Sequence, residues 1–193
     1  MKDISPAGIS ASAQGLSERD LLDRIRSRDA AAQRLFYERY VGYLTAVCYR
    51  YVPDPHAAKD VLQEAFIKIL PALENFQYRG EGSLKAWASR IVTNTALNSL
   101  RGKVSFASVD HVPELAAEED PEVTEVPAQV LQRLIQALPD GYRSVFNLFV
   151  FEKKTHREIA SLLGIKEDSS ASQYSRARTL LARQIKTYLK EHE

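Results

Sequence analysis

Apolar residues recur at steps of three and four along most of the chain, and no stretch of useful length alternates between apolar and polar residues. A step of three to four places side chains on one face of an α-helix, whereas strict alternation would indicate a β-strand. The clearest helical face lies in Ala30–Tyr51 and carries Leu35, Phe36, Tyr40, Leu44, Val47 and Tyr51. This periodicity predicts an all-α fold.

Capping residues and prolines divide the first half of the chain into four predicted helices. Ser17 is a typical N-cap for the first helix, and Ala30–Tyr51 forms the second. Pro55 suits the first turn of the third helix, because a proline there removes no hydrogen bond of the helix. We expect Ser83 to cap the fourth helix, which continues to Arg101.

An acidic segment with prolines separates the two halves of the chain. Residues 102–125 have a net charge of −6, whereas residues 17–101 have +3 and residues 126–193 have +4. Such a composition favours an extended linker over a packed element. Residues 1–16 are rich in Ser, Ala and Gly and show no sustained periodicity. We therefore predict a disordered tail at 1–16, a helical domain at 17–101, a flexible acidic linker at 102–125 and a second helical domain at 126–190.

The composition excludes several classes of protein. With 45% hydrophobic and 26% charged residues, the chain can bury a core. Its one cysteine, Cys48, cannot form an internal disulfide, and the histidines are dispersed, at positions 56, 111, 156 and 192. Since it also lacks a nucleophile motif and a phosphate-binding loop, we expect no metal, no cofactor and no enzyme activity. The chain has no long apolar stretch and no secretion signal, which predicts a cytoplasmic protein without membrane insertion.

The second half of the chain has the outline of a helix-turn-helix. Two helices are expected on either side of a turn at residues 139–141. Thr155 and Glu158 then form a capping box, which starts a short third helix. Gly164 supplies a left-handed C-terminal cap, and a last helix starts near Asp168.

The periodicity of this last helix predicts which of its residues face outward. We interpret the buried face as Ala171, Tyr174, Ala177, Leu181, Ile185 and Tyr188. This orientation exposes Ser169, Ser172, Gln173, Arg176 and Thr179. Arginine can pair with guanine and glutamine with adenine in a DNA groove, so we expect these five residues to contact DNA. In the alternative interpretation, the serines only start the helix and the arginines form an ordinary solvated surface.

Several strings, taken together and in order, resemble one family. They are DVLQEAFIKIL, GSLKAWASRIVTNTALNSLR, LPDGYRSVFNLFVFEKKTHREIASLLGI and SQYSRAR. They resemble the extracytoplasmic-function (ECF) sigma factors of the sigma-70 family, over roughly residues 17–190. The resemblance implies two helical domains, called regions 2 and 4, that direct bacterial RNA polymerase to the −10 and −35 elements of promoters. The implied partners are core RNA polymerase, through the β′ clamp helices and the β flap, promoter DNA and an anti-sigma factor.

The resemblance makes the helix with DVLQEAF the docking site for the clamp helices of the polymerase. Asp60, Gln63 and Glu64 lie within about one helical turn, so they offer a polar edge to a partner helix. We expect all three to contact polymerase, and Phe66 to pack in the core.

The resemblance also assigns residues 75–83 to a loop that captures a flipped −10 base. Phe76, Tyr78 and Arg79 offer aromatic rings and a cation for such a base. The following helix exposes further candidates for contact with the −10 strand: Arg90, Asn94 and Arg101. We expect Trp87 of that helix to pack in the core.

Two other functions remain open from the residues alone. Residues 126–190 would suffice for a helix-turn-helix regulator that does not melt promoters, although the aromatic loop would then be unexplained. A helical adaptor without any nucleic-acid role is compatible with the net charge of +1. Adding the protein to core polymerase and a promoter library would separate the three functions.

Overall fold

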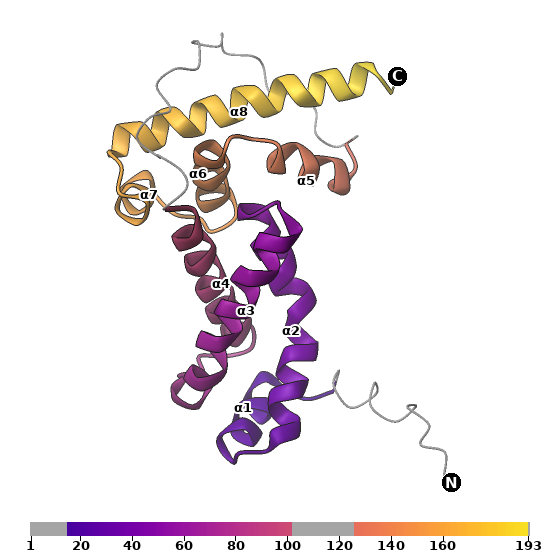
Figure 1. Ribbon diagram of the computed structural model, residues 1–193, viewed down its shortest axis with the longest axis vertical. Coiled ribbons are helices and arrows are strands. Elements are labelled where there is room, and N and C mark those ends of the chain that lie inside the picture. The colour runs from indigo at the N-terminus through magenta and orange to yellow at the C-terminus, as the bar shows by residue number, and fades with distance from the viewer. Residues whose placement is uncertain (1–14, 102–125, 193) are drawn as a thin grey trace. The chain divides into compact units, whose positions relative to one another are not determined.

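The computed structural model describes residues 15–101 and 126–192 (Figure 1). Within these two ranges the elements are helices, with no strand, so the predicted all-α fold is confirmed. The acidic linker predicted at 102–125 lies outside the described residues, as does nearly all of the tail predicted at 1–16.

The described residues form two compact units, and each is considered by itself. The first unit contains α1, the 3₁₀ turn η1 and most of the residues of α2, α3 and α4. The bounds of these elements are α1 (Glu18–Arg26), α2 (Ala30–Tyr51), α3 (Pro55–Ala72), η1 (Leu73–Asn75) and α4 (Ser83–Arg101). The second unit includes Tyr49–Ala57 and the residues from Ala96 onward; its own helices are α5 (Ala128–Gln136), α6 (Asp140–Val150), α7 (His156–Leu163) and α8 (Glu167–Lys190).

Local capping explains where three of the helices begin. The Ser17 hydroxyl accepts from the Asp20 amide at 3.1 Å, and a carboxylate oxygen of Asp54 accepts from the Ala57 amide at 2.8 Å. At α7 the full capping box forms. Each cap satisfies an amide that the first helical turn leaves without a partner.

The start of α4 differs from the prediction that Ser83 caps it. Ser83 is the first residue of the helix, and its hydroxyl accepts from the Arg79 amide at 3.2 Å. The next two amides of α4, those of Leu84 and Lys85, instead donate to the carboxylate of Glu18. The cap of α4 therefore comes from a residue distant in sequence.

The core of the first unit is built from the apolar faces of its helices. On α4 the buried stripe of this unit runs through Leu84, Ala88 and Val92, at steps of four. Trp87 is outside this stripe and only half-buried, so the prediction that it belongs to the core is wrong. The step of four from Leu84 places Trp87 at the edge of the buried face.

In the second unit α6 packs against α8 around Leu138, Tyr142, Ala177 and Leu181. The turn predicted at residues 139–141 ends two residues early, because α6 already begins at Asp140. Between α7 and α8, Gly164 has a φ of 69°, which confirms the predicted left-handed cap.

Candidate nucleic-acid and polymerase interfaces

A cavity of about 560 Å³ opens in the first unit, between the segment that follows α3 and the start of α4. Its walls include Asn75, Phe76, Gln77 and Arg79 on one side, and Ser83, Trp87 and Arg90 on the other. The rings of Phe76 and Trp87 lie 4.9 Å apart between centroids, at an angle of 46°. Phe76 is almost fully buried, whereas Trp87 retains an exposed part.

The chemistry of this cavity suits an aromatic ring that carries a negative charge. The partly exposed Trp87 offers a ring for stacking, and the side chains of Arg79 and Arg90 are exposed beside it. None of the described residues that line the cavity is acidic. A nucleotide has both an aromatic base and a phosphate, so the cavity has complementary groups for each.

The structure brings three of the predicted −10 residues, Phe76, Arg79 and Arg90, to this cavity. Tyr78 does not line it. The Tyr78 hydroxyl instead donates to Glu81 at 3.3 Å, and partial desolvation together with the charge of Glu81 raises the pKa of Tyr78. Tyr78 therefore presents its hydroxyl to a neighbouring carboxylate, and its contact with a −10 base stays a prediction.

Two other residues of α4 were predicted to face DNA, Asn94 and Arg101. Both are exposed in the structure, but neither lines the cavity. Trp87 is the cavity residue that the sequence analysis assigned to the core instead. One feature of the sequence could have indicated that Trp87 lines the cavity. It lies four residues after the start of α4, beside the aromatic loop at residues 75–83.

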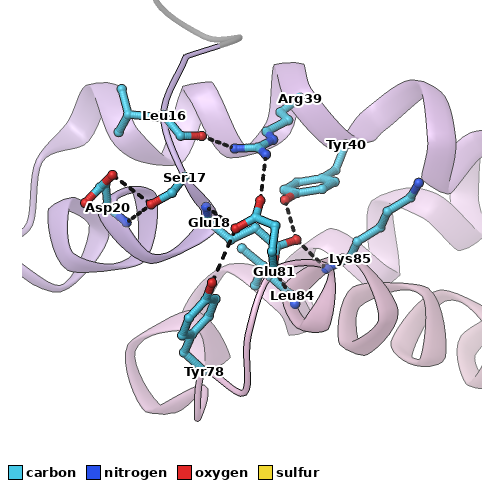
Figure 2. Close-up of polar contacts among 10 residues, drawn as sticks. All are labelled: Leu16, Ser17, Glu18, Asp20, Arg39, Tyr40, Tyr78, Glu81, Leu84 and Lys85. Atoms are coloured by element: carbon cyan, nitrogen blue, oxygen red, sulfur yellow. Dashed lines mark hydrogen bonds and ion pairs between the residues drawn. The ribbon is translucent and has the colours of Figure 1, made fainter.

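A buried network of polar contacts lies where α1, α2 and the start of α4 meet (Figure 2). Glu18 is 2% exposed, and its carboxylate accepts from the Tyr40 hydroxyl at 2.9 Å and from the Leu84 amide at 3.0 Å. The Lys85 amide donates to the same carboxylate at 3.2 Å. Burial and the bond to Glu18 raise the pKa of Tyr40 above its usual range, so this phenol remains a donor at any physiological pH.

The exposed face of α3 combines polar and apolar groups. Asp60, Gln63 and Glu64 are all exposed, as a polymerase contact requires, and Glu64 pairs with Lys68 at 2.5 Å. Ile67 is 65% exposed on the same helix, whereas Phe66 is buried as predicted. Sequence analysis did not single out Ile67, because the run AFIKIL resembles a core segment.

The capping box of α7 has the geometry that its sequence predicts. The carboxylate of Glu158 accepts from the Thr155 amide at 2.9 Å, and the Glu158 amide donates to the Thr155 hydroxyl at 3.3 Å. The bond from the Thr155 amide, followed by that from Lys154, lowers the pKa of Glu158. The capping residue is thus ionised at neutral pH.

The buried stripe of α8 lies one residue earlier than predicted at its N-terminal end. It contains Ser170, Gln173, Ala177 and Leu181. Gln173, predicted to contact DNA, is only 4% exposed, whereas Ala171, predicted to be buried, is exposed. The Ser170 hydroxyl lies 3.0 Å from Nδ1 of His156 on α7, so this buried polar group has a partner. One residue shifts the helix face by about 100°.

The remaining predicted contacts on α8 stay accessible. Ser172 is exposed, and Ser169, Arg176 and Thr179 are partly exposed. Tyr174 is half-buried, with its ring 4.3 Å from that of Phe149. The first half of α8 therefore presents a polar surface with one of the predicted cations, Arg176, and with the acidic residues Glu167 and Asp168 exposed at its start.

Other kinds of site receive no support from the described part of the chain. No group of three or more His, Cys, Asp or Glu side chains there could hold a metal ion. Among the same residues, no helix is long and apolar enough to cross a bilayer. Cys48 is buried, and burial raises the pKa of its thiol to about 11.

Comparison with known proteins gives matches to both halves of the chain. Residues 36–105 match the family Sigma-70 region 2, and residues 128–181 match the family Sigma-70, region 4. The first match begins within α2, so α1 lies outside it.

Whole-length relatives agree with these family matches. The chain is 32% identical over 193 residues to the RNA polymerase sigma-H factor of Pseudomonas aeruginosa, which covers 90% of this chain and 96% of the relative. It is 28% identical over 189 residues to the ECF RNA polymerase sigma-E factor of Escherichia coli K12, covering 91% of this chain and 97% of the relative. A solved structure of CnrH in complex with the cytosolic domain of CnrY shares 20% identity at a TM-score of 0.48, covering 88% of this chain and 97% of that one.

Proposed function

Since the chain belongs to the ECF sigma factors of the sigma-70 family, and so directs RNA polymerase to promoters, we propose that the cavity beside Trp87 receives a flipped base of the −10 element. The observation that carries this proposal is the cavity itself, with an accessible indole beside two exposed arginines and no acidic lining residue. Its volume of about 560 Å³ leaves room for a nucleobase.

The energetics of base capture support this use of the cavity. Extruding a base from a duplex costs a few kcal/mol. Stacking a base on an aromatic side chain returns about 1–3 kcal/mol, and arginine contacts to the phosphate add to it. Trp87, Arg79 and Arg90 can supply both terms at one place. Asn94 and Arg101, which are exposed, are proposed to contact the −10 strand as well.

For the −35 element we propose contacts from the accessible face of α8. Ser172 and the partly exposed Ser169, Arg176 and Thr179 are the candidates. Arginine can read guanine in the major groove, and serine or threonine can bind a base edge or a phosphate. Gln173 is left out of this proposal because it is buried.

For polymerase we propose docking through α3. Asp60, Gln63 and Glu64 provide a polar edge, and Ile67 provides an exposed apolar centre beside it. Interfaces commonly combine an apolar centre with a polar rim. The β′ clamp helices are the proposed partner of this face, and the β flap is the proposed partner of the second unit.

Regulation and location follow from the family resemblance alone. We propose that an anti-sigma factor restrains the protein, and that it acts in the cytoplasm, where polymerase and promoters meet. Sigma factors are generally not enzymes, and we propose no catalytic activity for this chain.

The test of the proposed function is reconstitution with core RNA polymerase. The holoenzyme would be incubated with duplexes of random sequence, and the bound duplexes would be sequenced and then transcribed. Two enriched elements separated by a fixed spacing, together with transcription that depends on the protein, are expected. Binding to DNA without polymerase and without opening would indicate a plain helix-turn-helix regulator, and binding to neither would indicate an adaptor; both results would overturn the proposal.

A further inference from the structure

We infer that α1 braces both walls of the cavity, with Glu18 and Arg26 as positioning residues that set the distance between Phe76 and Trp87. The inference rests on the proposed function of the cavity as a base-binding site. It concerns a helix outside the residues that match the Sigma-70 region 2 family. Neither Glu18 nor Arg26 lines the cavity, so any effect on base capture would act through the walls.

Glu18, at the start of α1, fixes the wall that α4 provides. The first amides of a helix lack partners within the helix, and the N-terminus also carries a partial positive charge. Here a buried carboxylate accepts from the Leu84 and Lys85 amides, as Figure 2 shows. Trp87 lies three residues after Leu84, hence nearly one helical turn from the anchored amides. Movement of Trp87 is therefore restricted by Glu18.

Arg26, at the other end of α1, fixes the opposite wall. Its guanidinium donates to the Phe76 carbonyl at 2.6 Å and to the Glu74 carbonyl at 3.4 Å. These two carbonyls belong to the segment that places Phe76 in the cavity. Between its two anchoring residues α1 is a rigid rod about 12 Å long. One short helix thus connects the backbone of both cavity walls.

Glu81 ties the tip of the loop to the same brace. Its carboxylate accepts from the Glu18 amide at 3.2 Å, pairs with Arg39 at 3.4 Å and accepts from the Tyr78 hydroxyl (Figure 2). The Arg39 guanidinium also donates to the Leu16 carbonyl at 2.7 Å. These contacts hold the loop between the two walls.

Trp87 is the only tryptophan of the chain, so its fluorescence in the full-length protein reports on one wall of the cavity. The main variant is Glu18→Gln, which keeps one oxygen but replaces the other acceptor with a donor. We expect acrylamide to quench Trp87 more efficiently in this variant. We also expect permanganate reactivity of −10 thymines in the holoenzyme to fall about tenfold, the factor for one charge-assisted hydrogen bond.

Controls separate positioning from folding. Glu38→Gln removes an exposed carboxylate of α2, whose one ion pair within residues 15–101 and 126–192 is with Arg34, and should behave as wild type in both assays. Val47→Ala removes methyl groups from the core of the same unit, far along α2, and lowers stability without touching the brace. Helicity and polymerase affinity are expected to be normal in Glu18→Gln. Equal opening by Glu18→Gln and Val47→Ala at matched stability, or wild-type quenching of Trp87 in Glu18→Gln, would overturn the inference.

Arg26→Gln tests the other end of α1. Because Arg26 is exposed, this variant places no altered group in the core and should fold normally. Arg34→Gln is its matched control, because Arg34 makes only a surface ion pair. Reduced opening by Arg26→Gln alone supports the brace, and unchanged opening by Arg26→Gln overturns it. Failure of the proposed function has a different signature: a Trp87→Ala holoenzyme that opens promoters normally would reject the cavity as a base site, whatever the α1 variants do.

Discussion

Trp87 should contribute directly to promoter opening, and its replacement tests the candidate site most sharply. Trp87→Ala removes the partly exposed indole that lines the cavity and contacts Phe76. Loss of one base–aromatic stack should cost about 1–3 kcal/mol. This corresponds to a loss in the equilibrium for opening of between about fivefold and 150-fold.

The same substitution will also lower stability, and this effect must be measured separately. Full truncation of a buried tryptophan costs about 3–5 kcal/mol, and truncation of a partly exposed one should cost less. Urea unfolding of the full-length protein gives this figure. Trp87→Phe keeps a smaller ring and should restore most of the opening, since every aromatic ring offers a face for stacking.

The assay compares a duplex promoter with one that carries a pre-opened −10 region. Permanganate reactivity of thymines measures opening on the duplex, and run-off transcription measures the rescue by the bubble. Because the mismatch already removes the cost of unstacking, transcription by Trp87→Ala should recover substantially on the bubble. Glu38→Gln, which removes an exposed carboxylate of α2 away from the cavity, should open the duplex normally. Normal opening by Trp87→Ala, or an equal defect in Glu38→Gln, would refute the assignment of the cavity.

Three further outcomes are expected. Ile67→Ala, alone or with Gln63→Ala, should weaken binding to core polymerase at least severalfold in a titration. The melting temperature should stay nearly unchanged, because both side chains are exposed. Unchanged affinity would show that α3 is not the docking face. Arg176→Ala should cost about 1–3 kcal/mol in promoter binding and relax selectivity at one −35 position. Gln173→Ala should lower stability without changing selectivity, because Gln173 is buried. A change in selectivity in Gln173→Ala would contradict the assignment of Gln173 to the buried face of α8. The pKa of Glu158 is lowered in the folded state, so its contribution to stability is present above the unfolded pKa of about 4.3 and is lost as pH falls through the folded pKa. Glu158→Gln should therefore be less stable than wild type at pH 7 by denaturant unfolding, and the difference should shrink as pH falls below the unfolded pKa.

Features that depend on neighbouring residues could be predicted from the sequence. The periodicity of Ala30–Tyr51 gave both ends of α2, and Ser17, Thr155 and Gly164 marked helix ends that the structure confirms. Capping bonds and left-handed turns form within three or four residues, so the residues that make them are adjacent in the printed chain. The resemblance to ECF sigma factors rested on such local strings in order, and the comparisons confirm it.

Features that depend on distant contacts were decided by the tertiary structure. Glu18 caps α4 across 66 residues, which no local pattern could indicate. Packing of α8 against α7, with Ser170 bonded to His156, buries Gln173 in place of Ala171. Trp87 lies at the edge of the buried face of α4 and lines the cavity, whereas the next residue, Ala88, is buried in the core. One position along the helix therefore decides between the two environments. The sequence by itself therefore determined the helices and the family, whereas only long-range packing decided which side chains remain free to meet DNA, because burial depends on neighbours that the chain brings from far away.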